Sequence, residues 1–434
     1  MSDLIERDKR HIWHPFTQHQ TERDPVGITS ASGAVMTDTD GREILDLISS
    51  WWTITHGHAH PPLVEAIASQ AAKMSHVMFS GFTHEPAVQL AEGLAEKLGA
   101  PLSRVFFSDN GSTAVEVALK IAFQYWRNRG ETKRTKFIAF DGAYHGDTFG
   151  AMAVGKGSGF FSLYDDLLAE VLVAPYAPTF LGDDAVENNE DAAIAALEAI
   201  IDHSGDEVAG LIIEPLFQGA GGMRFCRPEF IRRVTETARR AGILVIFDEV
   251  AAGFGRTGSL FAHQQCEVKP DLICLSKGLT AGMLPLSVTV MSDEIFNAFC
   301  DEDFAKALAH GHSFTGNPLA AAVAVKSLAL FEEEATLDKI AEIERSHRLF
   351  AASLSRHDEA CRVRVCGSLL AFDLASEAGT YKSKASLGLR DFYLSQGFNI
   401  RPLGPVVYLM PPYCITEAQL SRAYDGLLHG LNQL

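Results

Sequence analysis

Residues 109–116 (DNGSTAVE) follow an apolar run and begin a helical pattern. Gly111 and Ser112 are therefore expected at a helix N-terminus, where backbone N–H groups and the helix dipole attract phosphate. Thr113 and Glu116 have the spacing of a capping box, which is also typical of an ordinary helix start. Phosphate binding and simple capping both stay open at this segment.

Asp248 and Lys277 each follow a short apolar run that is typical of a buried strand. A buried aspartate can pair with a cationic ring nitrogen, and a partly desolvated lysine can form a Schiff base with an aldehyde. Each residue alone also fits an ordinary strand end. The Asp248 run also occurs in P-loop NTPases, but the chain lacks G-x-x-x-x-G-K-[ST].

Two further segments carry aromatic or imidazole side chains. Tyr144 lies on a Gly-flanked loop, where it could stack on a planar ligand or pack against the core. His56, His58 and His60 alternate, and on a strand they would share a face that could bind a metal ion. A metallohydrolase is therefore the alternative from another class, although the strand ends offer no further histidine ligand.

The elements that must position these residues alternate along the middle of the chain. Short apolar runs predict strands at 104–108, 136–141, 171–175, 208–215, 243–249, 271–275 and 285–291, with helices at 111–129, 190–202 and 228–241. Continuous apolar strands separated by helices indicate an α/β fold with a mostly parallel sheet covered on both faces. Asp248 and Lys277 are then expected at the same edge of that sheet.

The two ends of the chain have α+β character. Small antiparallel strands are predicted before residue 60. After residue 325 the pattern predicts two long helices, strands near 362–366, 369–374 and 406–410, and a last helix at about 416–431. We expect a large domain over 61–325 and a small domain assembled from 1–60 together with 326–434.

Charge and cysteine content exclude several classes of protein. With 37 basic and 55 acidic residues the formal net charge is −18, which is unlike a nucleic-acid-binding protein, and no basic amphipathic stretch suits a membrane surface. The seven cysteines include no C-x-x-C pair, and no apolar run is long enough for a membrane span. We expect a cytoplasmic protein that binds small molecules and no metal.

In combination these residues resemble the cofactor site of the class III aminotransferases, which are fold-type I pyridoxal-phosphate enzymes. The segments that carry the resemblance are IEP at 213–215, DEV at 248–250, GFGRTG at 253–258 and LSKGL at 275–279. The resemblance covers nearly the whole chain. It implies a large domain with a mostly parallel sheet, a small α+β domain, and a homodimer with its active sites at the interface.

The resemblance also implies roles for single residues. Lys277 would bind pyridoxal 5'-phosphate covalently and then move a proton, Asp248 would pair with the pyridinium nitrogen, and Tyr144 would lie over the ring near substrate. The implied phosphate and cofactor contacts are Gly111, Ser112 and, at the subunit interface, His312 and Ser313.

A narrower set of segments resembles the members that convert 8-amino-7-oxononanoate to 7,8-diaminononanoate in biotin biosynthesis. These segments are HIWHPFT at 11–17, SSWW at 49–52, MSHVMF at 74–79, YHGDTFGAM at 144–152, QGAGGM at 218–223 and YLMPPY at 408–413. Trp51 and Trp52 would line an apolar slot, and Arg401 would pair with a substrate carboxylate. The full set of implied substrate contacts is Phe16, Trp51, Trp52, Tyr144, Lys277, Gly311, Arg401 and Tyr408.

Two positions depart from the best-known members. Phe16 stands where they carry Tyr, so an aromatic face remains and a hydroxyl is lost. Gly311, His312 and Ser313 stand where they carry Gly-Pro-Thr, and His312 could alter the pocket for the amino donor. S-adenosylmethionine is the expected donor in a ping-pong cycle. A lysine-using version of the enzyme and another ω-aminotransferase are the alternatives within the family.

Overall fold

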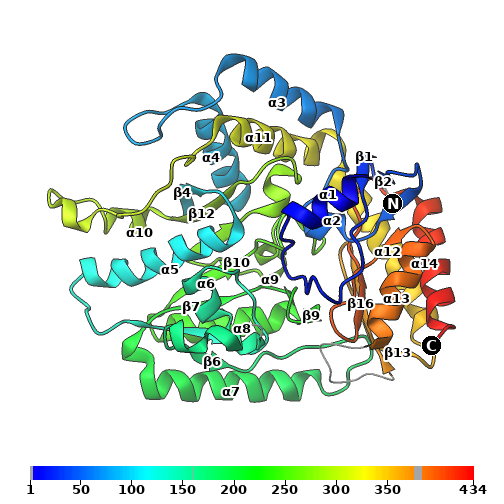
Figure 1. Cartoon of the computed structure of the whole chain (residues 1–434). Helices are drawn as coiled ribbons and strands as arrows, with labels where there is room; N and C mark the ends of the chain where they lie inside the picture. Colours follow the sequence, from blue (N-terminus) through cyan, green and yellow to red (C-terminus); the bar gives the residue numbers. More distant parts are fainter. Residues whose placement is uncertain (1–2, 160, 376–383) are drawn as a thin grey trace.

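The computed structural model describes residues 3–159, 161–375 and 384–434, and a seven-stranded sheet forms its centre (Figure 1). In spatial order the strands are β4 (Leu102–Ser108), β12 (Ser287–Ser292), β11 (Leu272–Leu275), β10 (Leu244–Asp248), β7 (Val208–Ile213), β5 (Lys136–Phe140) and β6 (Leu172–Ala174). All neighbours pair in parallel except those of β12, which is antiparallel to β11 and to β4. The predicted mostly parallel α/β sheet is confirmed.

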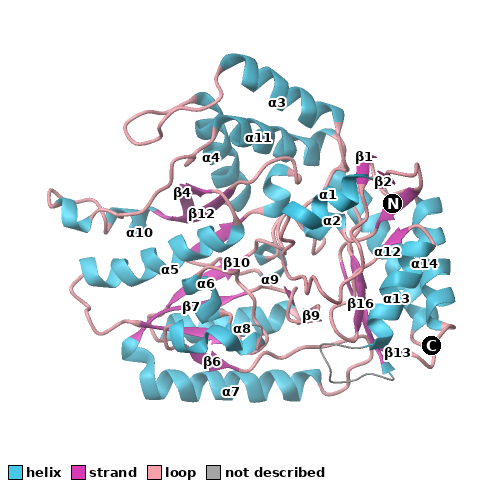
Figure 2. Ribbon diagram, viewed as in Figure 1, coloured by secondary structure: helices cyan, strands magenta, loops and turns pink. Residues whose placement is uncertain are grey.

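Helices cover both faces of this sheet (Figure 2), which explains its continuous apolar strands. On β10, Leu244 and Ile246 pack with α5 (Gly111–Asn128), while Val245 and Phe247 pack with α8 (Pro228–Arg240). Because successive side chains of a strand point to opposite faces, every position is buried in one layer or the other. The third large helix, α7 (Val186–Ser204), contacts β6 and α8.

A second group of helices packs beside the β4 end of the sheet. It consists of α3 (Pro61–Lys73), α4 (Glu85–Leu98) and α11 (Pro318–Glu333). Leu63 of α3 is buried against Val323 and Leu330 of α11. The remaining short elements are α1 (Asp3–His11), α2 (Ser49–Trp52), α6 (Phe149–Val154), β8 (Phe217–Gln218), β9 (Arg224–Phe225), α9 (His263–Cys266) and α10 (Asp293–Asn297), with 3₁₀ turns between them.

The two ends of the chain meet in one small sheet. Its strands are β1 (Ile28–Ser32), β2 (Val35–Asp38), β3 (Glu43–Asp46) and, from the far end of the sequence, β15 (Phe398–Asn399). A three-stranded sheet of β13 (Ala360–Cys366), β14 (Leu369–Leu374) and β16 (Val406–Leu409) lies with helices α12 (Thr336–Leu354), α13 (Lys384–Ser395) and α14 (Glu417–Leu431). The domain boundaries at 61–325 and at 1–60 with 326–434 stay a prediction.

One expected strand does not form. His56, His58 and His60 were predicted to share the face of a strand, but only His58 pairs, as a single bridge to Gly33. Gly57 adopts a φ of 108°, and α3 begins at Pro61 directly after the segment. Three side chains on one face would require an extended run, and this backbone turns instead.

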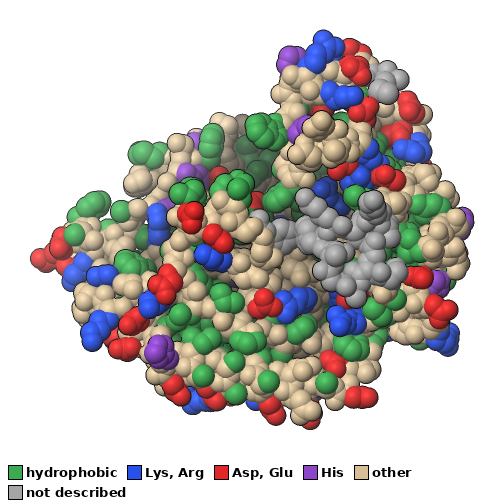
Figure 3. Space-filling model, turned by 60° about the horizontal axis from the view of Figure 1, so that its bottom comes forward, with side chains coloured by type: hydrophobic (Ala, Val, Ile, Leu, Met, Phe, Trp, Pro, Cys, Tyr) green, Lys and Arg blue, Asp and Glu red, His purple; other side chains and the backbone are tan. Residues whose placement is uncertain are grey.

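Over the ranges that the structure covers, no helix is both long and apolar enough to cross a membrane. On the face shown in Figure 3, acidic and basic side chains are interspersed among apolar ones.

The contact of α14 with β15 gives a test of the small-sheet packing. A Cβ added at Gly426 of α14 would lie 2.5 Å from Cε2 of Phe398, whereas Gly388 of α13 has open space around it. We expect Gly426→Ala to lower the free energy of unfolding by about 1–3 kcal/mol through overpacking. The matched Gly388→Ala should be neutral or stabilising by up to about 1 kcal/mol. Urea denaturation measures both, and equal stabilisation by the two substitutions would contradict this packing.

Candidate active site

The edge of the large sheet where its parallel strands end gathers most of the predicted residues. Asp248 is the last residue of β10, and Lys277 lies two residues beyond β11. Glu214 follows β7 directly, Tyr144 lies four residues beyond β5, and Gly111 begins α5 just after β4. The predicted shared edge of Asp248 and Lys277 is confirmed.

Helix α5 begins with a capping box, but not the predicted one. The Asn110 side chain accepts a hydrogen bond from the backbone N–H of Thr113 at 3.0 Å, and the Thr113 hydroxyl accepts from the N–H of Asn110 at 3.1 Å. The predicted pairing of Thr113 with Glu116 is wrong, because the Glu116 carboxylate instead accepts hydrogen bonds at the start of α6, including Gly150 N–H at 2.6 Å. Gly111 and Ser112 are the first residues of α5, as predicted.

Close packing holds the start of α5 against two loops of the site. A Cβ at Gly111 would lie 2.5 Å from Cγ1 of Val250, so only glycine allows this approach to the residues after β10. The Ser112 hydroxyl lies 2.7 Å from the Thr148 hydroxyl. It also accepts a hydrogen bond from the backbone N–H of Thr148 at 3.0 Å. Gly146, with a φ of 125°, lies directly against Ser112. The first turn of α5 is thereby joined to the loop that carries Tyr144.

Asp248 is buried and bound by His145. The Asp248 Oδ2 atom lies 2.7 Å from His145 Nδ1, and Oδ1 accepts a hydrogen bond from Val250 N–H at 3.0 Å. Both side chains are almost fully buried, and His145 Nε2 has no hydrogen-bond partner among the residues described. A buried carboxylate favours the protonated form of a ring nitrogen brought beside it. Sequence reasoning gave His145 no role, and its only signal was adjacency to Tyr144.

Glu214 holds the backbone of the loop that carries Tyr144. Its carboxylate accepts hydrogen bonds from the backbone N–H groups of Tyr144 and Gly219, both at 3.0 Å. Burial raises the pKa of Glu214 to about 7, with Asp248 acting in the same direction and His145 in the opposite one. Glu214 therefore fixes the backbone of Tyr144 rather than its side chain.

Lys277 has the electrostatic character expected of a proton carrier. Burial lowers the pKa of its amine to about 8, although the nearby Asp248 and Glu214 carboxylates act against that shift. The ammonium nitrogen lies 4.5 Å from the centre of the Trp52 ring, and the residue adopts a left-handed φ of 46°. A group that changes protonation near neutral pH suits acid and base steps.

Tyr144 is half-buried beside this amine-bearing edge. Its hydroxyl donates a hydrogen bond to Asp147 at 3.0 Å, and its ring stacks on Phe161 with 6.0 Å between centroids. Burial raises the pKa of the phenol above its usual range, with Asp147 adding to the shift. Tyr144 therefore stays protonated and can donate a hydrogen bond at any physiological pH.

Trp51 and Trp52 lie on an unusual turn. Element α2 is a single left-handed turn in which all four residues, none of them glycine, have φ between 43° and 71°. Left-handed helical geometry costs L-residues roughly 1–2 kcal/mol each. Arg256, which is 1% exposed, donates hydrogen bonds to the carbonyls of Ile54 at 2.8 Å and Pro411 at 3.1 Å, next to this turn. Tertiary contacts thus hold a conformation that the local sequence disfavours.

The two tryptophans have different environments. Trp52 is buried, and its indole N–H donates to the Tyr408 hydroxyl at 3.0 Å. Trp51 is 44% exposed, and its ring centroid lies 5.9 Å from that of Phe16. The Arg401 guanidinium carbon lies 5.1 Å from the centre of the Trp51 ring. The structure therefore places three further predicted substrate contacts, Phe16, Arg401 and Tyr408, against Trp51 or Trp52.

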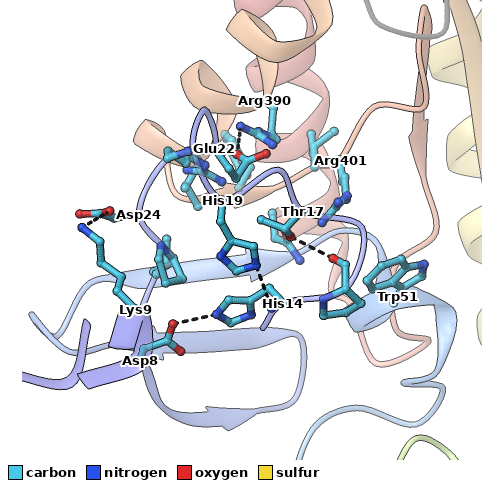
Figure 4. Close-up of a pocket in the computed structure, with 18 residues that line it drawn as sticks. Asp8, Lys9, His14, Thr17, His19, Glu22, Asp24, Trp51, Arg390 and Arg401 are labelled. Carbon is cyan, nitrogen blue, oxygen red and sulfur yellow. Dashed lines mark hydrogen bonds and ion pairs between the residues drawn. The ribbon is translucent and has the colours of Figure 1, made fainter. Parts of the chain in front are cut away.

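Trp51 and Arg401 line a cavity of about 330 Å³ (Figure 4). The segment after α1 lines one side and residues around β15 line the other, whereas Lys277 and Tyr144 do not border it. Arg390 in its wall is paired with Glu22 at 2.6 Å. Arg401 forms no ion pair with any carboxylate in the part of the chain described, so it is available to an anionic ligand.

The loop with Gly311, His312 and Ser313 is not joined to the cofactor edge within one chain. Gly311 and Ser313 are exposed, and His312 N–H donates to Thr315 at 3.1 Å. In the described structure no hydrogen bond links this loop to Gly111, Asp248 or Lys277. His312 Nε2 is buried without a partner in the same described set.

The histidines proposed as metal ligands have separate partners. His56 Nε2 lies 3.2 Å from the Ser327 carbonyl, His58 Nε2 is 2.9 Å from Asp46, and His60 Nε2 is 3.0 Å from Glu334. Burial lowers the pKa of His56 to about 4. Across the described ranges, no group of three or more His, Cys, Asp or Glu side chains could hold a metal ion.

The residues at the sheet edge fit a cofactor with a phosphate, a cationic ring and an aldehyde. A helix start with a tightly packed glycine offers N–H groups to phosphate, and Asp248 offers a buried carboxylate to the ring. Lys277 supplies an amine whose lowered pKa favours the nucleophilic form.

Comparison with known proteins agrees with this chemistry. The family model described as aminotransferase class-III matches residues 16–431. The chain is 48% identical to the adenosylmethionine-8-amino-7-oxononanoate aminotransferase of Synechococcus elongatus, over 98% of this chain and 99% of the relative. It is 40% identical to the protein of the same name from Geobacter sulfurreducens, over 98% and 96% of the two chains.

Solved structures give the same fold. The adenosylmethionine-8-amino-7-oxononanoate aminotransferase of Methanocaldococcus jannaschii is 33% identical, with a TM-score of 0.92 over 99% of this chain and 98% of the other. The omega transaminase of Pseudomonas jessenii in complex with PMP is 27% identical, with a TM-score of 0.93 over 100% and 98% of the two chains.

The lowered pKa of Lys277 predicts how this residue affects stability. In cofactor-free protein, burying the charged amine lowers the free energy of unfolding, because the pKa of Lys277 falls from 10.5 in the unfolded chain to about 8 in the folded one. This destabilisation is full below pH 8 and disappears as the pH rises toward 10.5. We expect the free energy of unfolding of Lys277→Met to exceed that of the natural chain by about 1–3 kcal/mol at pH 7. This difference should narrow by pH 10. Urea denaturation at both pH values measures it. The exposed Lys133→Met is the control, and a gap that does not change with pH would contradict the prediction.

Proposed function

Because the chain belongs to the class III aminotransferases, we propose that it aminates the ketone of 8-amino-7-oxononanoate to give 7,8-diaminononanoate, a step of biotin biosynthesis. The enzyme is a pyridoxal-phosphate-dependent transaminase by family, and S-adenosylmethionine is the proposed donor in a ping-pong cycle. The observation that carries the proposal is the full-length similarity to several enzymes that bear this name. The Arg401 guanidinium beside Trp51, unpaired among the residues described, is consistent with a long substrate that ends in a carboxylate.

Pyridoxal 5'-phosphate, when bound, supplies an electron sink for the carbon that carries the amino group. The residues of this chain hold the group and move protons. Backbone N–H groups at Gly111 and Ser112 bind its phosphate, and Asp248, oriented by His145, keeps the ring nitrogen protonated. Lys277 would hold the cofactor covalently and, with its lowered pKa, would serve as the group that takes up and returns a proton. Tyr144 would lie near the ring, with its hydroxyl oriented by the hydrogen bond that it donates to Asp147.

The other end of the site selects the substrate. Trp51 and Trp52 form the apolar slot for the carbon chain, and Tyr408 holds Trp52 in place. The planar Arg401 guanidinium pairs with the terminal carboxylate, for which its two-pronged geometry is suited. The Phe16 ring lies beside Trp51, tilted by 55° to it, and would border the slot with an aromatic edge or face but no hydroxyl.

A second copy of the chain completes the site in this proposal. Exposed apolar side chains gather where the segment after α3 meets the segment before α11. The ring centroids of Phe314 and His76 are 5.3 Å apart there, and Phe314 is 62% exposed. Met78 and Phe82 are 58% and 59% exposed in the same segment. A homodimer would cover them and would bring Gly311, His312 and Ser313 to the neighbouring cofactor and substrate.

The amino donor separates two versions of the proposal. The names of the relatives contain adenosylmethionine, whereas Phe16 and His312 depart from the best-known members. Omega transaminases share the fold at 26–27% identity, which keeps a different amine–carbonyl pair as a second candidate. Assays of 8-amino-7-oxononanoate with S-adenosylmethionine or lysine, and of pyruvate as acceptor, decide among the three. Turnover of pyruvate but not of 8-amino-7-oxononanoate would overturn the proposal.

Lys277 gives the most direct test of the cofactor. The purified natural chain should be yellow, with a visible band that borohydride removes. Lys277→Ala should lose that band and at least about a thousandfold in activity, because both the covalent link and the proton carrier are gone. Absorption spectra and steady-state assays measure the two losses. A colourless natural chain that binds no pyridoxal phosphate would overturn the cofactor assignment.

Arg401 gives the test of the substrate carboxylate. We expect Arg401→Ala to lower kcat/KM for 8-amino-7-oxononanoate by about 10- to 100-fold, since a hydrogen bond to a charged group contributes about 1.5–3 kcal/mol. Pyridoxal phosphate affinity should change less than twofold. Arg422→Ala is a matched control, because Arg422 also lies 5.1 Å from an aromatic ring, that of Phe398. Equal loss of cofactor and substrate binding would show that Arg401 is structural.

A further inference from the structure

Asp46 is a buried carboxylate with an unusual number of donors. It ends β3 and is 0% exposed. Its Oδ2 accepts hydrogen bonds from Ser50 at 2.7 Å and His58 at 2.9 Å, and its Oδ1 accepts from Asn399 at 3.1 Å and, more weakly, from Ile48 N–H at 3.4 Å. Burial acts to raise the pKa of Asp46, but the hydrogen bonds of His58 and Ser50 outweigh it and hold the pKa below its usual value. Asp46 therefore stays ionised and only accepts.

These donors come from two separate parts of the substrate end. Ser50 lies inside the left-handed turn, directly before Trp51. Asn399 is the last residue of β15, two residues before Arg401, and it is the register partner of Asp46 in the small sheet. In addition, the backbone N–H of Leu47 donates a hydrogen bond to the Asn399 carbonyl at 3.2 Å. One carboxylate thus links the turn that carries Trp51 to the strand that leads to Arg401.

The turn needs such a link because its own sequence does not favour it. Four successive non-glycine residues in the left-handed region persist only where surrounding contacts determine them. Asp46 is the acidic side chain bonded to the turn, and Ser50 is its contact point. The 5.1 Å approach of the Arg401 guanidinium to Trp51 depends on both segments having fixed positions.

We propose that Asp46 is a positioning residue for substrate: it sets Trp51 against Arg401 and so determines selectivity for ligands with a long apolar chain ending in a carboxylate. The role rests on the proposed function in that Arg401 receives the carboxylate. Asp46 is fully buried and so acts through its neighbours, and His58 supports it as a further donor at Oδ2, whereas Asn399 donates to Oδ1.

Asp46→Asn is the primary test, because it keeps the shape but turns one accepting oxygen into a donor. We expect KM for 8-amino-7-oxononanoate to rise about tenfold, while kcat and the visible cofactor band change less than twofold. The dissociation constant of nonanoate, an unreactive carboxylate of the same length, should rise about tenfold by calorimetry. Asp38→Asn is the matched control: Asp38 is a buried aspartate in the same sheet that accepts from Arg42 N–H at 2.8 Å and does not touch the turn.

Ser50→Ala removes a single donor and tests the role if Asp46→Asn fails to fold. A rise of about threefold in the nonanoate dissociation constant is expected. In the Arg401→Ala background, Asp46→Asn should raise KM by less than twofold further, because the positioned group is already absent.

Three results would overturn the role: unchanged nonanoate binding in Asp46→Asn and Ser50→Ala, an equal loss in Asp38→Asn, or full additivity with Arg401→Ala. If the natural chain aminates no ketone, the proposed function fails, yet the nonanoate titrations still decide whether Asp46 positions the carboxylate site.

Discussion

Six of the seven strands in the large sheet run in one direction, and the reactive residues depend on that constraint. Parallel strands need crossover helices, so each strand ends at the same edge and each connection begins there. Five residues of the site lie at the end of one of these strands or within four residues after it: Gly111, Tyr144, Glu214, Asp248 and Lys277. Their mutual distances follow from strand spacing, and the loops adjust only the last few ångströms through glycine contacts and the hydrogen bond of His145 with Asp248.

The site concentrates charge that a folded protein ordinarily keeps in water. Asp248, Glu214 and Arg256 are at least 95% buried, and the amine of Lys277 is partly desolvated. Buried ionised groups cost free energy unless they are paired, and here they pair with His145, with backbone N–H groups and with carbonyls. The formal charge of −18 is a property of the whole chain and does not describe this region. Local groups, namely a helix start and the Arg401 guanidinium, which has no ion pair among the residues described, are what would attract anionic ligands.

Much of the fold and of the cofactor edge could be predicted from the sequence. The strands that end near Asp248 and Lys277 follow from uninterrupted apolar runs, because burial on both faces leaves no polar positions. The start of α5 at Gly111 was also predicted, although its capping partner was misassigned: Glu116 has the spacing of a cap, but the start of α6 competes for it.

The substrate end was less predictable. The left-handed turn at Trp51 has no glycine to signal it. One of its contacts is local, from Ser50 to Asp46, but those of Arg256 with the carbonyls of Trp52 and Ile54 come from a residue far away in the sequence. The alternating histidines suggested a strand with a shared face, but the backbone turns at Gly57 and gives each ring a different partner. A contact such as Asp46 with Asn399, 353 residues apart, leaves no pattern in either local segment.

That separation has a consequence for synthesis on the ribosome. At roughly 5–20 residues per second, the strand that pairs with β3 leaves the ribosome tens of seconds after β3 itself. During that interval Asp46 lacks its Asn399 donor, and the turn at Trp51 lacks the contacts of Ser49 and Arg256 with residues 410 and 411. Until residues 399–411 have been made, the nascent chain therefore carries a β3 edge without its β15 partner and a tryptophan turn without these contacts. The region around Trp51 can therefore form completely only after translation has passed residue 411.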